Sequence, residues 1–287
     1  MINTFAQLEA ECQEQEIYEI AQINTSIEHD ISVEQVREFA KNTLFAMKDA
    51  ISVGIKSDEL SLSKMCGTDC KRVQNYFKST ASVFGKLFEK ILIYSLATAE
   101  ENIRMGKIVA CPTAGSCGIL PSVIISIGEE YNKTDEQMVN ALITAGEIGR
   151  IIATKVSLAG AVAGCQAECG AAAAMSAGAA TQLLGGDVHQ ILNASALALK
   201  NILGLTCDPV AGLVEVPCVK RNCFMGVHAM TACQLALCGV QTKIPPDEVV
   251  EAMEQTGLLM SPTLKESSQA GLATTETGLK IKKQVFG

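Results

Sequence analysis

Apolar residues recur at helical spacing along most of this chain. Three such stretches, 33–54, 135–154 and 188–201, each follow a capping residue that stands three positions before a glutamine. In this capping-box pattern, two side chains satisfy free backbone N–H groups at the start of a helix. The same spacing predicts further helices over 4–22, 78–104, 118–131, 166–184, 223–239 and 247–256. Strand-like alternation is scarce, so the pattern predicts a mostly α fold.

The stretch 156–184 is long enough to cross a membrane. It consists largely of Ala and Gly, and Gln166, Glu168 and Gln182 interrupt it. Transmembrane helices depend instead on Leu, Ile, Val and Phe. We therefore predict a close-packed central helix, whose small residues let other backbones or a cofactor approach, and no contact with a membrane.

Three regions interrupt the helical pattern. Residues 57–76 are polar and turn-rich, which predicts a loop or flap. Two prolines prevent 203–222 from forming one helix, and the tail 261–287 is less regular. Because no repeat or linker divides the chain, we expect one compact domain over 1–287.

Composition narrows the class of protein. The formal net charge is −8, aromatic residues make up 4% of the chain, and no run of basic residues is present. This combination argues against nucleic-acid binding. Hydrophobic residues make up 48% of the chain, which excludes a disordered protein.

The chain contains twelve cysteines among its 287 residues. Dense disulfide frameworks are typical of short secreted proteins, yet the opening residues contain neither the basic segment nor the apolar core of a signal peptide. We therefore expect a cytoplasmic protein whose reduced cysteines fill the core or bind metal. The sequence has no C-x2-C pair, which weakens a zinc interpretation, and ferredoxin-type runs are absent too.

Two kinds of loop could carry chemistry. Cys207 and Cys218 stand beside prolines and glycines, and cysteines in irregular backbone are well placed to converge on a metal. The loop 108–120 leads into an apolar helix, with the hydroxyls of Thr113 and Ser116 expected to face outward. Such a helix start favours a carboxylate or phosphate, although an ordinary capped turn would have the same pattern.

Four blocks in this order resemble one known family. They are ACPTAGSCGILP at 110–121, AGCQAECG at 163–170, GLTCDPVAG at 204–212 and VPCVKRN at 216–222, with ESSQAGLA following at 266–273. Together they closely resemble the α subunit of iron–sulfur-dependent L-serine dehydratase, over about residues 57–275. No single block would be specific enough.

The resemblance implies an all-α catalytic domain that binds a [4Fe-4S] cluster through Cys165, Cys207 and Cys218. An iron without a protein ligand would act as a Lewis acid on the β-hydroxyl of L-serine, which is converted to pyruvate and ammonia. The resemblance also implies a binding loop for the substrate carboxylate, formed by Thr113, Ala114, Gly115 and Ser116.

No residue is assigned as the catalytic base. We expect the three histidines at the surface or in a satisfied core, and a lysine base would need strong desolvation. The histidines and lysines considered as a base are His29, His189, His228, Lys155 and Lys200. Single-chain relatives carry an extra N-terminal domain with a Ser-Ser-His-Thr motif that is missing here. We therefore expect a β subunit as partner, and it is a candidate source of the base.

Several residues next to the predicted ligands could have either of two roles. Cys169 lies one helical turn after Cys165 and is either a substitute ligand or a packing residue, and the family pattern favours packing. Arg221 and Asn222 either bind cluster sulfides or cap a helix, and Asp208 is expected to be a turn residue. The remaining cysteines are expected to be structural or incidental: Cys12, Cys66, Cys70, Cys111, Cys117, Cys223, Cys233 and Cys238.

Other functions are compatible with these residues. A cysteine desulfidase on the same scaffold would release sulfide instead of hydroxide. A redox or sensing protein would hold a fully ligated iron–sulfur cluster, for example through Cys169. A zinc-stabilised helical module would hold no iron.

Overall fold

The computed structural model describes residues 2–287, and within them the regular structure is helical, without a strand. The mostly α prediction is therefore confirmed. The α-helices are α1 (Phe5–Glu11), α2 (Ile17–His29), α3 (Val33–Lys56), α4 (Asp69–Phe77), α5 (Gly85–Ile103), α6 (Ile119–Glu130), α7 (Asp135–Ala153), α8 (Gly160–Ala163), α9 (Cys165–Leu183), α10 (Val188–Lys200), α11 (Cys218–Leu237), α12 (Pro246–Leu259) and α13 (Glu276–Phe286). Short 3₁₀ turns lie at Ala114–Ser116 (η1), Val210–Gly212 (η2), Pro262–Leu264 (η3) and Gly271–Thr274 (η4).

All three predicted capping boxes are present. Ser32, Thr134 and Asp187 each accept a hydrogen bond from the backbone N–H of the glutamine three residues later, and each glutamine side chain bonds back. These reciprocal bonds satisfy N–H groups that have no partner inside the helix. The helices α3, α7 and α10 therefore begin where the sequence pattern places them.

Other predicted boundaries were wrong. The single helix expected over 4–22 is two helices, because Glu16 and Glu19 form a further capping box that starts α2. Residues 57–68 are irregular as expected, but the rest of the predicted loop forms α4. The tail is more ordered than its periodicity indicated, since Thr275 caps α13 by accepting from the N–H of Gly278.

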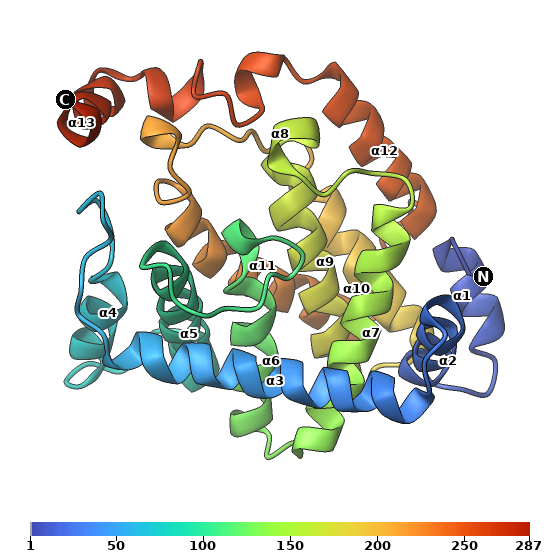
Figure 1. Cartoon of the computed structure of the whole chain (residues 1–287). Helices are drawn as coiled ribbons and strands as arrows, with labels where there is room; N and C mark the ends of the chain where they lie inside the picture. The colour runs from blue at the N-terminus through green and yellow to red at the C-terminus, as the bar shows by residue number, and fades with distance from the viewer. Residues whose placement is uncertain (1) are drawn as a thin grey trace.

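The small-residue helix α9 lies at the centre of the molecule and packs against α6, α7, α10 and α11 (Figure 1). Every residue of α9 except Glu168 and Gln182 is buried. Alanine and glycine let four neighbouring helices approach closely, and close contact provides the dispersion energy that large side chains provide elsewhere. No helix among residues 2–287 is long and apolar enough to cross a membrane.

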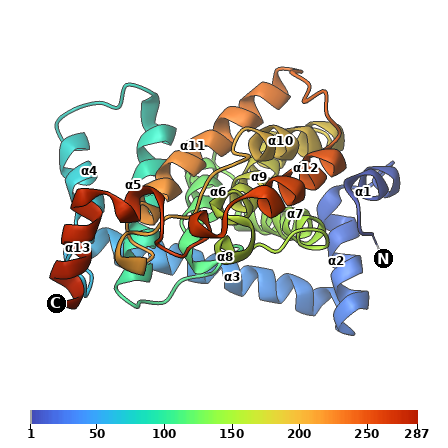
Figure 2. The ribbon, with the colours of Figure 1, turned by 90° about the horizontal axis from the view of Figure 1, so that it is seen from above.

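The remaining helices surround this centre. The long helix α3 runs along one side of the molecule and contacts α2, α5 and α7 (Figure 1). The two termini lie at opposite ends in both views (Figures 1 and 2). After α12 the chain returns toward the first turn of α9, where Cys207 forms an isolated bridge with Lys265. This arrangement brings segments distant in sequence together at one end of α9.

Candidate active site

The first turn of α9 is fixed by the residue that follows Cys165. The backbone N–H of Gln166 donates to the carbonyl of Leu205 at 2.9 Å, and its side-chain amide donates to two further backbone carbonyls. Its Oε1 accepts from the N–H of Gly204 at 2.9 Å. These bonds attach the segment that leads to Cys207 directly to the start of α9.

Buried cysteines gather at this point. Cys165 Sγ lies 3.4 Å from Cys169 Sγ, and both pack with Cys207 in one small cluster. The backbone of Cys207 is held on both sides: its N–H donates to the carbonyl of Leu264 at 2.8 Å, and its carbonyl accepts from the N–H of Glu266 at 2.7 Å. The returning tail therefore fixes the position of Cys207.

Cys218 had been expected in irregular backbone. Instead, it is the first residue of α11. That expectation was wrong because Pro217 occupies the cap position, where a proline is compatible with a helix that starts after it. Burial, and secondly the charge of Cys165, raises the pKa of Cys218 to about 12. One packed cluster thus contains Cys165, Cys169 and Cys207, and Cys218 lies outside it but near enough for the charge of Cys165 to act on its thiol.

The thiols in this group differ in electrostatics. Hydrogen bonds from Cys169 and Cys207 lower the pKa of Cys165 well below its usual range, and the nearby guanidinium of Arg221 acts in the same direction. The pKa values of Cys169 and Cys207 are raised, first by their bonds to Cys165 and then by burial. A thiolate within this group is thus stabilised by hydrogen bonds from its neighbouring thiols and by Arg221, and a thiolate is the form that binds metal.

Sequence reasoning missed the role of Glu168, which had been noted only as a polar interruption. Its carboxylate accepts a short hydrogen bond from the hydroxyl of Thr113 and lies 3.9 Å from Cys165 Sγ. Burial, and secondly the charge of Cys165, raises the pKa of Glu168 to about 7. Ligand atoms of Cys165, Glu168 and Cys169 lie within 4.8 Å of one another, close enough to hold a metal ion. The i, i+3, i+4 spacing of these residues was the available signal.

Gly160, a buried glycine of α8, packs against this group. A Cβ atom at this position would lie 3.1 Å from Cys207 Sγ, 3.4 Å from an oxygen of Glu168 and 3.5 Å from an oxygen of Glu266. A thiol and two carboxylates from three segments therefore surround one glycine. Glu266 belongs to the late ESSQAGLA block, but the sequence had not indicated its place beside the cysteines.

The predicted substrate loop lies against Glu168. Its residues Ala114–Ser116 form η1, and a Cβ atom on Gly115 would lie 2.5 Å from a Glu168 oxygen, so the loop backbone approaches that carboxylate closely. Thr113 is partly exposed, but Ser116 is fully buried and its hydroxyl bonds within the loop. The expectation that both hydroxyls face outward is therefore wrong for Ser116, because the loop closes on its own side chains.

Asn222 joins this loop to the start of α11. Its side-chain amide donates to the carbonyls of Gly115 and Cys218, both at 2.9 Å, and its Oδ1 accepts from the N–H of Gly118 at 2.8 Å. Asn222 was expected either to bind cluster sulfides or to cap a helix. These bonds resemble capping, because the side chain satisfies backbone groups. The substrate loop and Cys218 are thus held by one buried side chain.

The partly buried Arg221 pairs with the buried Asp208 between the segments that carry Cys218 and Cys207. The guanidinium donates to the carbonyl of Thr206 at 2.9 Å and to Asp208 Oδ1 at 3.1 Å. The second oxygen of Asp208 accepts from the N–H of Leu272 at 2.8 Å. Asp208 therefore does more than form a turn, since it links the cysteine segment to Arg221 and to the tail.

The candidate bases lie away from the cysteines. His189 pairs with Glu9 and Gln241 at the surface, and His228 Nε2 lies 2.7 Å from a backbone carbonyl of α10. His29 is exposed at the end of α2. The lysine side chains are also engaged, Lys155 with Glu251 and Lys200 with the carbonyl of Thr242. This agrees with the expectation that none of these residues is an obvious base.

The twelve cysteines all lie within the described residues and all are free thiols. Only Cys238 is exposed. Burial raises the pKa of Cys233 to about 11 and that of Cys70 to about 12. Such thiols behave as small apolar side chains, which agrees with the structural role expected for most of the set.

Comparison with known proteins agrees with this geometry. Residues 7–273 match the family described as "Serine dehydratase alpha chain". The chain is 40% identical over 283 residues to a "Probable L-serine dehydratase, alpha chain" of Bacillus subtilis, covering 95% of this chain and 94% of that protein. It is 37% identical to the "L-serine dehydratase, alpha chain" of Peptoniphilus asaccharolyticus, covering 99% and 98%.

Longer relatives match over a smaller region. The "L-serine dehydratase TdcG" of Escherichia coli is 40% identical over 185 residues, which cover 64% of this chain and 41% of that protein. These relatives are named as L-serine dehydratases, which are lyases. With the cysteine group and the family match taken together, the chain belongs to the serine dehydratase alpha chain family.

Proposed function

We propose that this chain is the catalytic α subunit of an L-serine ammonia-lyase that converts L-serine to pyruvate and ammonia. The observation that supports the proposal is the packing of Cys165 with Cys207 beside the loop at Thr113–Ser116, with Cys218 near enough for the charge of Cys165 to act on it. Three segments far apart in sequence meet there, in a family whose relatives are named for this activity.

The donor set fits an iron–sulfur cluster. The three thiols are buried and free, and thiolates are the ligands that such clusters prefer. We propose a [4Fe-4S] cluster held by these three cysteines, with Cys169 as a packing neighbour. When bound, a cluster with one iron free of protein ligands supplies a Lewis acid for the departing β-hydroxyl. A fully ligated cluster that includes Cys169 would instead suit electron transfer or sensing.

The chain's own residues would bind and orient the rest of the substrate. In this proposal the loop Thr113, Ala114, Gly115 and Ser116 binds the serine carboxylate through the backbone N–H groups of Ala114 and Gly115, because those of Thr113 and Ser116 bond within the loop. The carboxylates of Glu168 and Glu266, which both face Gly160, lie opposite the ammonium group. Because Glu168 also accepts from Thr113, one side chain connects the two halves of the binding site.

The proposed ammonium site is tested with Glu168→Gln, which keeps the shape of the side chain and removes its charge. The KM for L-serine is expected to rise roughly tenfold, as for the loss of one charge-assisted hydrogen bond. Inhibition by L-glycerate, which has no ammonium group, is expected to change less. An equal loss for both compounds would show that Glu168 supports the loop and does not bind the amine.

The proposed partner is a β subunit. Relatives that match over their full length are named as α chains, whereas the E. coli relative carries more than half of its sequence outside the matched region. The missing base, for which the cysteine group offers no histidine or lysine, is proposed to come from this partner. We also propose a cytoplasmic location, because twelve free thiols require a reducing compartment.

The activity is tested with anaerobically purified chain, with and without its partner, by measuring pyruvate from L-serine and from L-cysteine. We expect pyruvate from L-serine only when iron, sulfide and the partner are present. A strong preference for L-cysteine would support the desulfidase alternative. No pyruvate from either compound, with an intact cluster and the partner present, would reject the lyase proposal.

A further inference from the structure

A second buried carboxylate lies beside the cysteine group and takes no part in it. Glu215 lies between η2 and Cys218 in the chain, and it is buried. Its Oε2 accepts two hydrogen bonds from one distant segment, from Ser61 Oγ at 2.7 Å and from Ser63 Oγ at 2.8 Å. Ser61 is itself buried, so these bonds are shielded from water.

The segment that these serines belong to, residues 57–68, closes on itself. The N–H of Ser61 donates to the carbonyl of Cys66 at 2.8 Å, and the N–H of Met65 donates to Ser63 Oγ at 3.1 Å. Cys66 Sγ in turn lies 3.9 Å from the carbonyl of Glu215. The tip of the segment, residues 61–66, is therefore attached to the chain just before Cys218.

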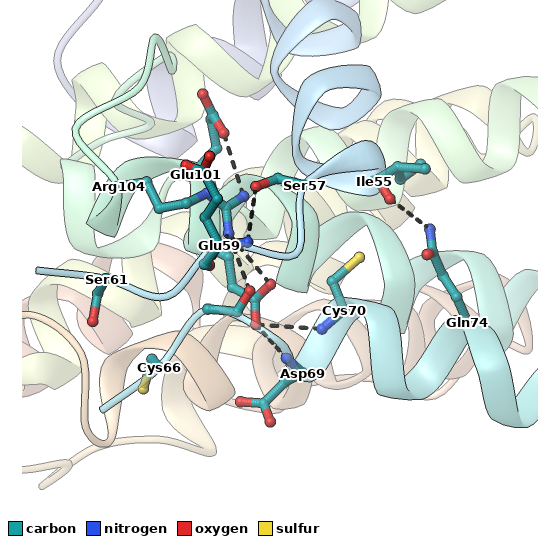
Figure 3. A network of polar contacts seen from close by, with 12 residues as sticks. Ile55, Ser57, Glu59, Ser61, Cys66, Asp69, Cys70, Gln74, Glu101 and Arg104 are labelled. Atoms are coloured by element: carbon teal, nitrogen blue, oxygen red, sulfur yellow. Dashed lines mark hydrogen bonds and ion pairs between the residues drawn. The ribbon is translucent and has the colours of Figure 1, made fainter. Parts of the chain in front are cut away.

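The other side of the same segment is anchored separately, on α5 (Figure 3). Arg104 donates to the carbonyls of Glu59 and Gly67 at 3.3 and 3.2 Å. The buried carboxylate of Glu100 accepts from the N–H of Asp69 at 2.6 Å. Loss of the Glu215 bonds would thus loosen the tip at Ser61 and Ser63 without detaching its base, while Lys220 Nζ still donates to Cys66 Sγ at 3.6 Å.

The tip forms a wall of a cavity next to the proposed substrate loop. The cavity measures about 640 Å³, and its walls include Leu62–Lys64, Ala114, Leu213–Glu215 and the end of α13. Ala114 belongs to the loop proposed to bind the serine carboxylate. Glu215 therefore lies where movement of the tip would reshape the surroundings of that loop.

We propose that Glu215 is a positioning residue for the substrate site: it holds the tip 61–66 against the wall that contains Ala114, and so keeps the site in its serine-binding form. This inference rests on the proposed function. Glu215 acts through the serines and the loop, and it does not contact the proposed cluster ligands or the substrate. Its hydroxyl partners are neutral, so the contact can open without separating an ion pair.

The test compares Glu215→Leu, which removes the acceptor oxygens, and the double variant Ser61→Ala/Ser63→Ala with a control, Ser57→Ala, in the complete anaerobic enzyme. Ser57 lies in the same segment but bonds only locally, to the N–H of Glu59. For the two test variants we expect the KM for L-serine to rise roughly five- to tenfold while kcat changes less than about twofold. Iron and sulfide content should stay unchanged.

Amide hydrogen exchange provides a second readout that does not depend on turnover. Exchange at 61–66 should accelerate in both test variants, whereas the amides of Asp69 and Cys70, which bond to Glu100, should keep their protection. Faster exchange with an unchanged KM would overturn the positioning role, as would loss of iron from Glu215→Leu. Unchanged exchange would also reject it. Absence of pyruvate from the wild-type enzyme would instead reject the proposed function.

Discussion

From Ala171 to Leu183, α9 buries mostly methyl groups, whereas its first turns bury Cys165, Cys169 and much of the carboxylate of Glu168. In the first region the few hydroxyls bond to carbonyls of their own helix, as Ser176 does to Ala172 at 2.7 Å. In the second region, polar groups depend on partners from other segments. One helix thus combines a self-sufficient core with a site that only the complete fold can assemble.

The difference shows how burial acts on different groups. Around the body of α9, exclusion of water stabilises the fold through packing. At its first turns, exclusion of water raises the pKa of Glu168 to about 7 and keeps water from the thiols of Cys165 and Cys169. Burying such groups costs free energy unless they have partners, so the well-packed core offsets what the site costs. Four experiments compare residues of the site, the core and the surface, and they are given in order of expected effect.

The largest effect is expected from removal of a proposed ligand, with a core cysteine as the matched control. Cys207→Ala should lower iron content and reduce kcat/KM for L-serine by more than about 100-fold, because a ligand is lost. Cys233→Ala in α11 should retain iron and activity, at a cost in stability of about 1 kcal/mol. Iron analysis and pyruvate assays measure both. Retained iron and turnover in Cys207→Ala would refute the ligand assignment.

The next effect concerns the buried ion pair. Arg221→Met leaves Asp208 without its partner and should lower the free energy of unfolding by about 3 kcal/mol, since a buried charge is left uncompensated. The double variant Arg221→Met/Asp208→Asn should recover part of this loss. Denaturant unfolding of the metal-free chain measures both. Equal losses in the single and double variants would show that the uncompensated charge of Asp208 is not the cause of the loss.

Two glycines in helices test the core itself. A Cβ atom on Gly178 of α9 would lie 2.3 Å from the side chain of Ile148 and 2.8 Å from that of Ser195. Gly178→Ala should therefore destabilise the fold by about 1–3 kcal/mol. Gly146 of α7 has open space around the same position, so Gly146→Ala should stabilise by about 0.5–1 kcal/mol. A gain in stability from both substitutions would contradict the close packing of α9.

The smallest effect lies at the surface, where α10 meets α1. The hydrogen bond to Glu9 is the main cause that raises the pKa of His189. A raised histidine pKa stabilises the fold below the unfolded value of about 6.5, and this contribution is lost as pH rises through the folded pKa. The pair is exposed, so we expect only about 0.3 kcal/mol. Unfolding at pH values on both sides of this range should show the change in wild type and not in His189→Gln.

Local signals explain which parts of the fold could be read from the sequence. The capping boxes at Ser32, Thr134 and Asp187 place helix starts because their bonds join residues three apart. The same method failed at 4–22, where apolar periodicity continues through the turn that separates α1 from α2. It also missed α13, whose mostly exposed residues give little periodicity to detect.

The candidate site divides in a similar way. The family blocks identified Cys165, Cys207, Cys218 and the loop that begins at Thr113, because each block is a continuous sequence. The contact of Glu168 with that loop joins residues 55 positions apart, and Glu215 reaches Ser61 over 154 positions. No spacing rule relates such pairs.

By itself, the sequence determined the helical class, most helix starts, the small-residue character of α9 and the family to which the chain belongs. These depend on bonds and periodicities within about one helical turn, or on blocks of adjacent residues. Only the tertiary structure decided that Glu168 joins the first turn of α9 to the loop at Thr113, that Arg221 pairs with Asp208, and that Glu215 bonds to the segment around Ser61. The physical reason is that these charges are buried, and the partners that satisfy them come from segments that meet only when the chain folds.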